Sequence, residues 1–116
     1  MDKDINVKNF KLKTILTITT GYSFVKDFYD VFELVWFITG DNLINTLGLS
    51  IVSEDIKKHL FTIYPELKKV KYKKNKSIQE FLIEQEEKFG SVLPVTRLGI
   101  DLPKEEKTKV KSKFKN

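Results

Sequence analysis

Between Ser23 and Gly40 the hydrophobic residues recur with the period of about 3.6 residues that is typical of an α-helix. On a helical wheel they fill about half of the circumference, and most charged residues share the other half. Ser23 suits the N-cap position, and Gly40 suits the left-handed residue that ends many helices. The pattern predicts an amphipathic helix over residues 23–40, with an apolar face formed by Phe24, Val25, Phe28, Tyr29, Val31, Phe32, Val35, Trp36 and Ile38.

Leu34 and Phe37 do not fit this pattern, because they fall among the charged residues of the wheel. Two interpretations are open. In the first, a strand or the C-terminal tail covers both side chains. In the second, they form an exposed apolar spot that binds a partner protein. Leu34 and Phe37 are therefore the candidate residues for an apolar partner contact.

Alternation of apolar and polar residues predicts two strands, one near each end of the chain. In residues 10–20 the apolar side chains that begin with Phe10 share one face, lysines and threonines share the other, and β-branched residues are frequent. Residues 92–100 read as the last strand. Pro94 should lie at an edge or a non-bonded position, because proline cannot donate a hydrogen bond to a ladder.

Residues 41–53 show no clear period, and we expect a loop there with a short strand or helical turn. Ser53 precedes two acidic residues, as at the start of a helix, and apolar residues then recur at helical spacing. Pro65 disfavours the helical conformation of the residue before it. A second helix should therefore run from about residue 53 to residue 64.

A third helix is predicted over residues 77–89, because Ser77 and Glu80 have the spacing of a capping box. The element order is then β, α, loop, α, α, β. Because two strands alone make a marginal sheet, the predicted strands should pair with each other, with a third short strand available from the loop. The sequence predicts an α+β fold in which two or three short β-strands pack on about three α-helices.

The composition agrees with one folded domain over residues 10–103. The chain has 116 residues, of which 41% are hydrophobic and 12% aromatic, which is enough for a core. Residues 1–9 are polar and are expected to be loose, and residues 104–116 are expected to form a basic disordered tail. The chain has no cysteine, and no apolar run reaches the length of about 18 residues that a membrane span requires. We expect a cytoplasmic protein that makes no membrane contact.

The net charge of +5 is concentrated in two segments. Residues 68–76 contain six lysines and no acid, and residues 104–116 contain six lysines and two acids. A solvated linker and a solubilising tail are the simple interpretation. The alternative is that lysines surrounding an aromatic ring contact nucleic-acid phosphates or an acidic partner, without the arginine that usually reads bases. The candidate residues are Lys68, Lys69, Lys71, Tyr72, Lys73, Lys74 and Lys76.

Catalytic chemistry is weakly represented in the sequence. His59 is the only histidine, and zinc sites and catalytic triads need further ligands or partners. Asp41 follows the end of the main helix, where we expect it to form a turn. We predict no enzyme activity, no metal and no cofactor. A small-ligand or nucleotide binder that uses Asp30, Asp41 and Tyr64 is the weakest of the hypotheses.

Five short segments together resemble a family of small uncharacterised proteins of tailed bacteriophages and prophages. They are LTITTG at residues 16–21, YDVFEL at 29–34, ITGD at 38–41, the Tyr-Pro-x-Leu of 64–67 and LPV at 93–95. The resemblance covers residues 12–98. The chain departs from it after Asn42, where family members often carry a Thr-His-Gln-Leu-Pro-like segment.

The resemblance implies a setting in the cytoplasm of an infected or lysogenic bacterium, and small phage proteins without catalytic motifs commonly bind a host protein. The leading hypothesis is a non-enzymatic accessory protein that inhibits or redirects a host macromolecule, with a CRISPR nuclease or another defence protein as the candidate target. The alternative is a sequence-tolerant nucleic-acid-binding module that uses Lys68–Lys76 and the basic tail. The oligomeric state is left open.

Overall fold

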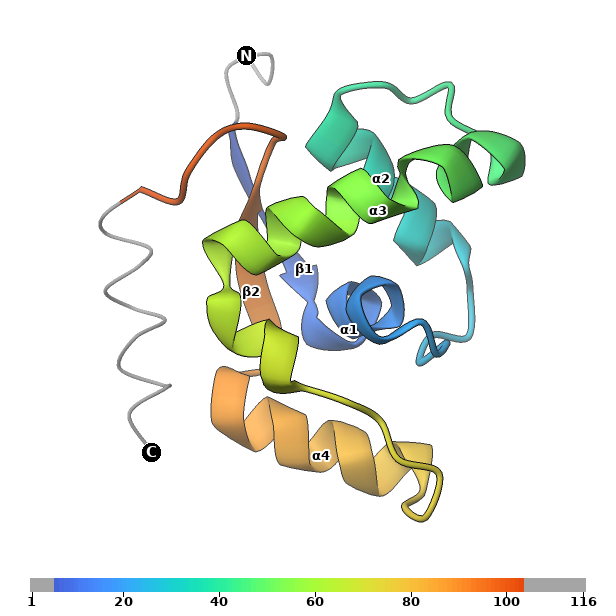
Figure 1. The fold of residues 1–116 in the computed structure, drawn as a ribbon, viewed down its shortest axis with the longest axis vertical. Coiled ribbons are helices and arrows are strands. Elements are labelled where there is room, and N and C mark those ends of the chain that lie inside the picture. The colour runs from blue at the N-terminus through green and yellow to red at the C-terminus, as the bar shows by residue number, and fades with distance from the viewer. Residues whose placement is uncertain (1–5, 104–116) are drawn as a thin grey trace.

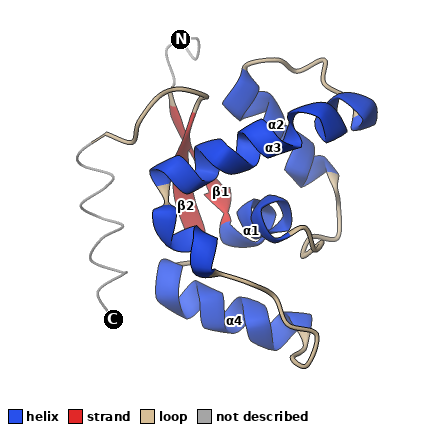
Figure 2. Ribbon diagram, in the orientation of Figure 1, coloured by secondary structure: helices blue, strands red, loops and turns tan. Residues whose placement is uncertain are grey.

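The structure is a computed structural model that describes residues 6–103. It has an α+β fold, as predicted, in which helices cover a two-stranded antiparallel sheet (Figures 1 and 2). The predicted tail at 104–116 lies outside the described residues. In chain order the elements are β1 (Val7–Lys11), α1 (Leu12–Thr20), α2 (Tyr29–Thr39), α3 (Thr46–Ile63), the 3₁₀ helix η2 (Pro65–Lys69), α4 (Ile78–Phe89) and β2 (Val92–Thr96).

The sheet pairs the two ends of the described chain. β1 and β2 are antiparallel, with Phe10 opposite Leu93 and Asn9 opposite Pro94. The first and last strands pair with each other as predicted, although the first strand shares only residues 10 and 11 with the predicted one. In a two-stranded sheet Pro94 lies on an edge strand, as proline requires. The prediction that residues 1–9 are loose is wrong for residues 7–9, which belong to β1. β2 ends at Thr96, earlier than the predicted residue 100.

The prediction of a strand over residues 10–20 is wrong, because residues 12–20 form α1. Leu12 and Leu16 share a face in a strand and in a helix alike, so alternation did not separate the two structures. In α1 the hydroxyls of Thr17 and Thr20 donate to the backbone carbonyls four residues earlier, at 2.8 and 2.7 Å. These bonds satisfy threonine hydroxyls within a helix. Ile15, placed on neither strand face, is fully buried.

α2 is shorter than the predicted helix, but it ends where predicted. Gly40 has φ of +74° and its N–H donates to the Trp36 carbonyl at 2.8 Å. At the other end Ser23 is not the cap. The Asp27 carboxylate accepts from the Tyr29 N–H at 3.0 Å, and the chain before it is irregular.

The predicted loop over 41–53 is mostly helix, and no third strand forms from it. α3 begins after Asn45, whose side chain accepts from the Gly48 N–H at 3.0 Å. This N-cap lies eight positions before the predicted one at Ser53, because Gly48 and the serines that follow it resemble loop residues in the sequence. The end of α3 before Pro65 and the capping box of Ser77 at α4 are both confirmed.

α1 lies at the centre of the helical layer, where it contacts α2, α3, α4 and β1. The structure supports the interpretation that Leu34 and Phe37 are covered, and for Phe37 the cover includes strand β1. Leu34 is fully buried, and the Phe37 ring packs against Phe10 of β1 with centroids 5.7 Å apart. The Arg97 guanidinium covers the other side of the Phe37 ring at 4.5 Å. The prediction that these two residues form an exposed apolar spot is therefore wrong.

Candidate anion-binding surface

The basic segment predicted from the sequence is divided between η2 and the connector that follows it. Lys68 and Lys69 lie in the last turn of η2, where positive charge is favourable. Lys71, Lys73 and Lys74 are exposed on the connector. Lys76 differs from the other lysines, because its ammonium contacts both carboxylate oxygens of Glu84, at 2.6 and 2.7 Å.

Tyr72 does not have the role expected from the sequence. Its ring is half-buried in a cluster with Tyr22, Phe24 and Phe81, at centroid distances of 5.0, 5.6 and 5.2 Å. Its hydroxyl donates to the Lys76 carbonyl at 2.9 Å. Tyr72 therefore anchors the connector to the rest of the fold. The exposed ring of the cluster is Tyr22, which is 40% exposed.

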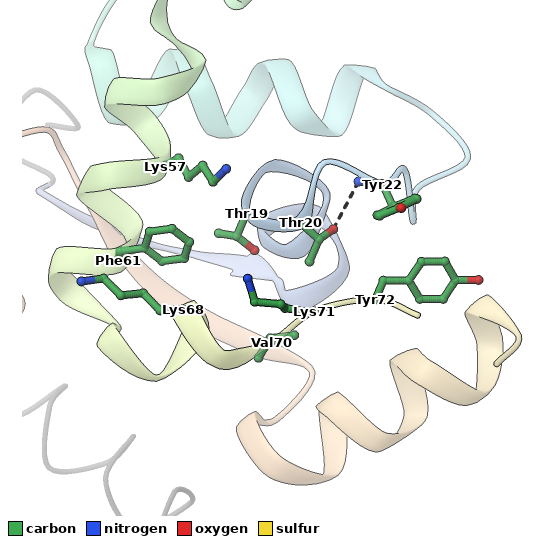
Figure 3. A pocket seen from close by; sticks show the side chains of 9 residues that line it. All are labelled: Thr19, Thr20, Tyr22, Lys57, Phe61, Lys68, Val70, Lys71 and Tyr72. Atoms are coloured by element: carbon green, nitrogen blue, oxygen red, sulfur yellow. Dashed lines mark hydrogen bonds between the residues drawn. The ribbon is translucent and has the colours of Figure 1, made fainter. Parts of the chain in front are cut away.

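A hollow of about 500 Å³ lies between α1, α3, η2 and the connector (Figure 3). Lys57 and Lys68 lie with Phe61 towards one end, the two tyrosines lie towards the other, and the threonines and Lys71 lie between them. In this view the ammonium groups of Lys57 and Lys71 lie on opposite sides of Thr19, whereas that of Lys68 is directed away past Phe61. Among residues 6–103, no acidic residue lines this hollow, whose walls are formed by Thr19, Thr20, Tyr22, Lys57, Phe61, Lys68, Val70, Lys71 and Tyr72.

The two threonines of the hollow differ in their hydrogen bonds. The Thr20 hydroxyl donates to the Leu16 carbonyl and accepts from the Tyr22 N–H at 3.2 Å. The Thr19 side chain is 6% exposed, and its hydroxyl has no hydrogen-bond partner among the described residues. Native proteins contain few buried polar groups that lack a hydrogen-bond partner. The Thr19 hydroxyl is therefore an unsatisfied group beside the hollow.

A second hollow, of about 360 Å³, lies on the other side of the connector and shares Lys71 with the first. Glu84 lines it and already neutralises Lys76. The charge around this hollow is therefore more balanced than that around the first. Gln85 contributes a buried side-chain oxygen that has no partner within residues 6–103.

The residues considered for ligand chemistry have structural roles. His59 is buried, and its Nε2 lies 2.9 Å from the Thr96 carbonyl, which makes Nε2 the protonated nitrogen. The Tyr64 hydroxyl donates to the Pro94 carbonyl at 2.6 Å. The Asp41 carboxylate accepts from the Leu43 N–H at 2.9 Å, which confirms the predicted turn. Asp30 lies in the first turn of α2, where an acid stabilises a helix.

Within the described part of the chain, no group of three or more His, Asp or Glu side chains is placed to hold one metal ion. No helix in residues 6–103 is both long enough and apolar enough to cross a membrane. Comparisons with protein families, with curated proteins and with solved structures find no match to this chain.

The sequence identified Lys68, Lys71 and Tyr72 as functional candidates but missed other lining residues. Lys57 was not singled out, and Thr19 was placed on the polar side of a strand. Their proximity depends on the packing of α1 against α3, which no local pattern encodes. One signal was available: Lys57 and Phe61 have the spacing of neighbours on a helix.

Proposed function

We propose that the protein is a non-enzymatic module that binds nucleic acid through the surface formed by η2, the connector and the adjoining face of α3. The observation that carries this proposal is that Lys57 and Lys71 line one hollow in which no acidic residue of the described chain takes part. Concave sites lined by charge of one sign attract counter-ions strongly. The exposed ring of Tyr22 adds the stacking surface that single-stranded nucleic acid requires.

The surface favours binding without sequence preference. Its cations are lysines, which contact phosphates as point charges, and no arginine lines the hollow. Phosphate contacts position a nucleic acid but carry no sequence information directly. Each contact with a single strand should contribute about −0.7 to the slope of log K against log salt concentration.

Fluorescence anisotropy with labelled oligonucleotides tests this proposal. We expect single-stranded DNA to bind at about 50 mM salt, and the affinity to fall steeply by about 200 mM. Replacing Lys71, Lys73 and Lys74 together by alanine should weaken binding and flatten the salt dependence. Lys88→Ala, a single charge removed from the last turn of α4, is a control that should bind as the wild type does. Absence of binding at the lower salt concentration would refute the proposal.

A second candidate function is favoured by the first turns of α3. Leu47 and Ile51 lie four residues apart, on one side of the helix, and are 73% and 74% exposed. Leu43, just before the helix, is 85% exposed. Apolar side chains that are exposed together commonly mark protein contacts. They support the phage-type hypothesis, in which the protein acts in the bacterial cytoplasm on a host defence protein such as a CRISPR nuclease.

This candidate predicts that bacteria expressing the protein lose CRISPR interference, measured as plaque formation by a targeted phage. Leu47→Asp with Ile51→Asp should restore interference, because two charges would remove the apolar contact. Leu98→Asp alters an exposed leucine elsewhere and should leave the inhibition intact. Equal plaque counts with and without the protein would count against this function.

A further inference from the structure

We propose that the hollow between α1, α3, η2 and the connector is a specific site for a nucleoside monophosphate, either free or at the end of a single strand. The phosphate would lie between Lys57 and Lys71, against Thr19, and the base would lie on Tyr22. This inference rests on the proposed nucleic-acid binding and adds a defined subsite to it. It goes beyond a charged surface, because it assigns one end of the hollow to the anion and the other to the base.

The first argument is electrostatic. Lys57 belongs to α3 and Lys71 to the connector, both line the hollow with Thr19, and in the view of Figure 3 their ammonium groups lie on opposite sides of Thr19. Neither forms an ion pair within residues 6–103, whereas Lys76 does. Like charges held near each other repel. A phosphate between them would replace this repulsion by two charge-assisted hydrogen bonds.

The second argument concerns Thr19. Its hydroxyl is one of two buried side-chain polar atoms without a partner in the described chain, and the other, on Gln85, lines the neighbouring hollow beside Lys71. Burial of a hydroxyl without a hydrogen bond is unfavourable. A phosphate oxygen would give the Thr19 O–H an acceptor. The unsatisfied Thr19 hydroxyl therefore belongs to the same hollow in which Lys57 and Lys71 would bind the phosphate.

The third argument concerns size and shape. A volume of about 500 Å³ exceeds what one phosphate needs and falls within the range of small-molecule sites. The end of the hollow away from Phe61 is formed by Tyr22 and Tyr72, which pack edge to face at 5.0 Å. Because Tyr72 holds Tyr22 in place and Tyr22 stays 40% exposed, a base can stack there at little entropic cost.

Thermal-shift and calorimetric titrations with inorganic phosphate, AMP and adenosine test the site directly. AMP should raise Tm and bind more tightly than inorganic phosphate, and adenosine should bind more weakly than AMP. A 5′-phosphorylated oligonucleotide should also bind more tightly than the same oligonucleotide with a 5′-hydroxyl. If neither phosphate nor AMP raises Tm at concentrations up to about 10 mM, the site does not exist as proposed.

Two variants distinguish AMP binding at this site from a general effect of positive charge. Lys57→Ala should weaken AMP binding about tenfold, the loss expected for one charge-assisted hydrogen bond. Lys58→Ala removes an equal charge from the next position of α3, which lines a different hollow, and should change AMP binding little. Equal losses in the two variants would show that net charge alone governs binding and would overturn the proposal.

Thr19→Val gives a readout that a purely structural role would not produce. The substitution keeps the shape and removes the unpartnered hydroxyl, so Tm of the free protein should rise while AMP affinity falls. Thr17→Val is the matched control, because the Thr17 hydroxyl is paired with the Lys13 carbonyl and the Phe24 N–H, and its loss should lower Tm. A lower Tm in Thr19→Val would contradict the assignment.

The outcomes distinguish this site from the broader function. If oligonucleotides bind through the connector lysines but AMP does not bind, the subsite is refuted and the nucleic-acid-binding module stands. If AMP binds with the predicted variant effects but oligonucleotides do not, the site is a nucleotide site and the proposed function is refuted.

Discussion

The two halves of α3 use their apolar side chains in opposite ways. The first half leaves Leu47 and Ile51 exposed, whereas the second half buries Ile56, Leu60 and Ile63. Figure 1 shows the start of α3 on the far side of α2 from the strands, and the rest of the helix passing across α2 and then the sheet, with α1 below it. The same helix thus contributes a core element and an apolar surface. The difference shows that hydrophobicity in this segment does not by itself indicate burial.

The largest loss of stability should come from a substitution in the buried second half of α3. Leu60 is fully buried, and Leu60→Ala should destabilise the fold by about 2–5 kcal/mol, because it leaves a cavity in the core. Urea denaturation followed by the fluorescence of Trp36, the only tryptophan, measures this loss. A loss below about 1 kcal/mol would mean that the second half of α3 is not a core element.

A smaller loss is expected at His59, which connects the same half of α3 to β2. His59→Leu removes the hydrogen bond to the Thr96 carbonyl and should cost about 1–2 kcal/mol in the free energy of unfolding. His59→Gln keeps a donor and should lose less. Equal losses in the two variants, measured in the same urea assay, would show that ring packing and not the hydrogen bond matters.

The stability of the exposed first half of α3 depends on its N-cap residue, Asn45. Asn45→Ala removes the side chain that accepts from the Gly48 N–H and should destabilise the protein by about 1 kcal/mol. Asn45→Asp retains an acceptor at the positive end of the helix and should be nearly neutral. The change in helical circular dichroism and in Tm checks both. If Asn45→Ala behaves as the wild type does, other contacts hold the start of α3.

The smallest change in stability should come from a substitution on the exposed first half of α3. Leu47→Asp should change the free energy of unfolding by no more than about 0.5 kcal/mol, because the side chain is exposed and an acid is favourable in the first turn. Ile56→Asp places the same charge in the buried half and should prevent folding. Soluble expression and Tm of the two variants provide the sharpest contrast between the halves.

Three local signals in the sequence predicted the ends of elements correctly, whereas the caps predicted at Ser23 and Ser53 were wrong. The capping box of Ser77, the left-handed Gly40 and the stop before Pro65 each act within a few residues, so they can be identified without a structure. The pairing of the first and last predicted strands was also correct.

The errors have physical causes of two kinds. In α1 the apolar positions fit both periods, and threonines favour strands in general although their hydroxyls are satisfied here by carbonyls of the helix. In α3 the cap residue Asn45 was taken for part of a loop. Lys68, Lys71 and Tyr72 of the basic segment line the hollow, but the hollow also requires Lys57 and Thr19, which only tertiary packing brings to Lys71.

The anchoring of Tyr72 has a consequence for how tightly the proposed surface would bind an anion. A run of lysines on a free chain must be ordered when it binds, and that lost freedom weakens the complex. Here the ring contacts with Phe24 and Phe81 fix the path of the backbone beforehand. The lysines on either side of Tyr72 therefore start from defined positions. If the ring contacts of Tyr72 were lost, the connector would keep all its lysines but would have to be ordered during binding.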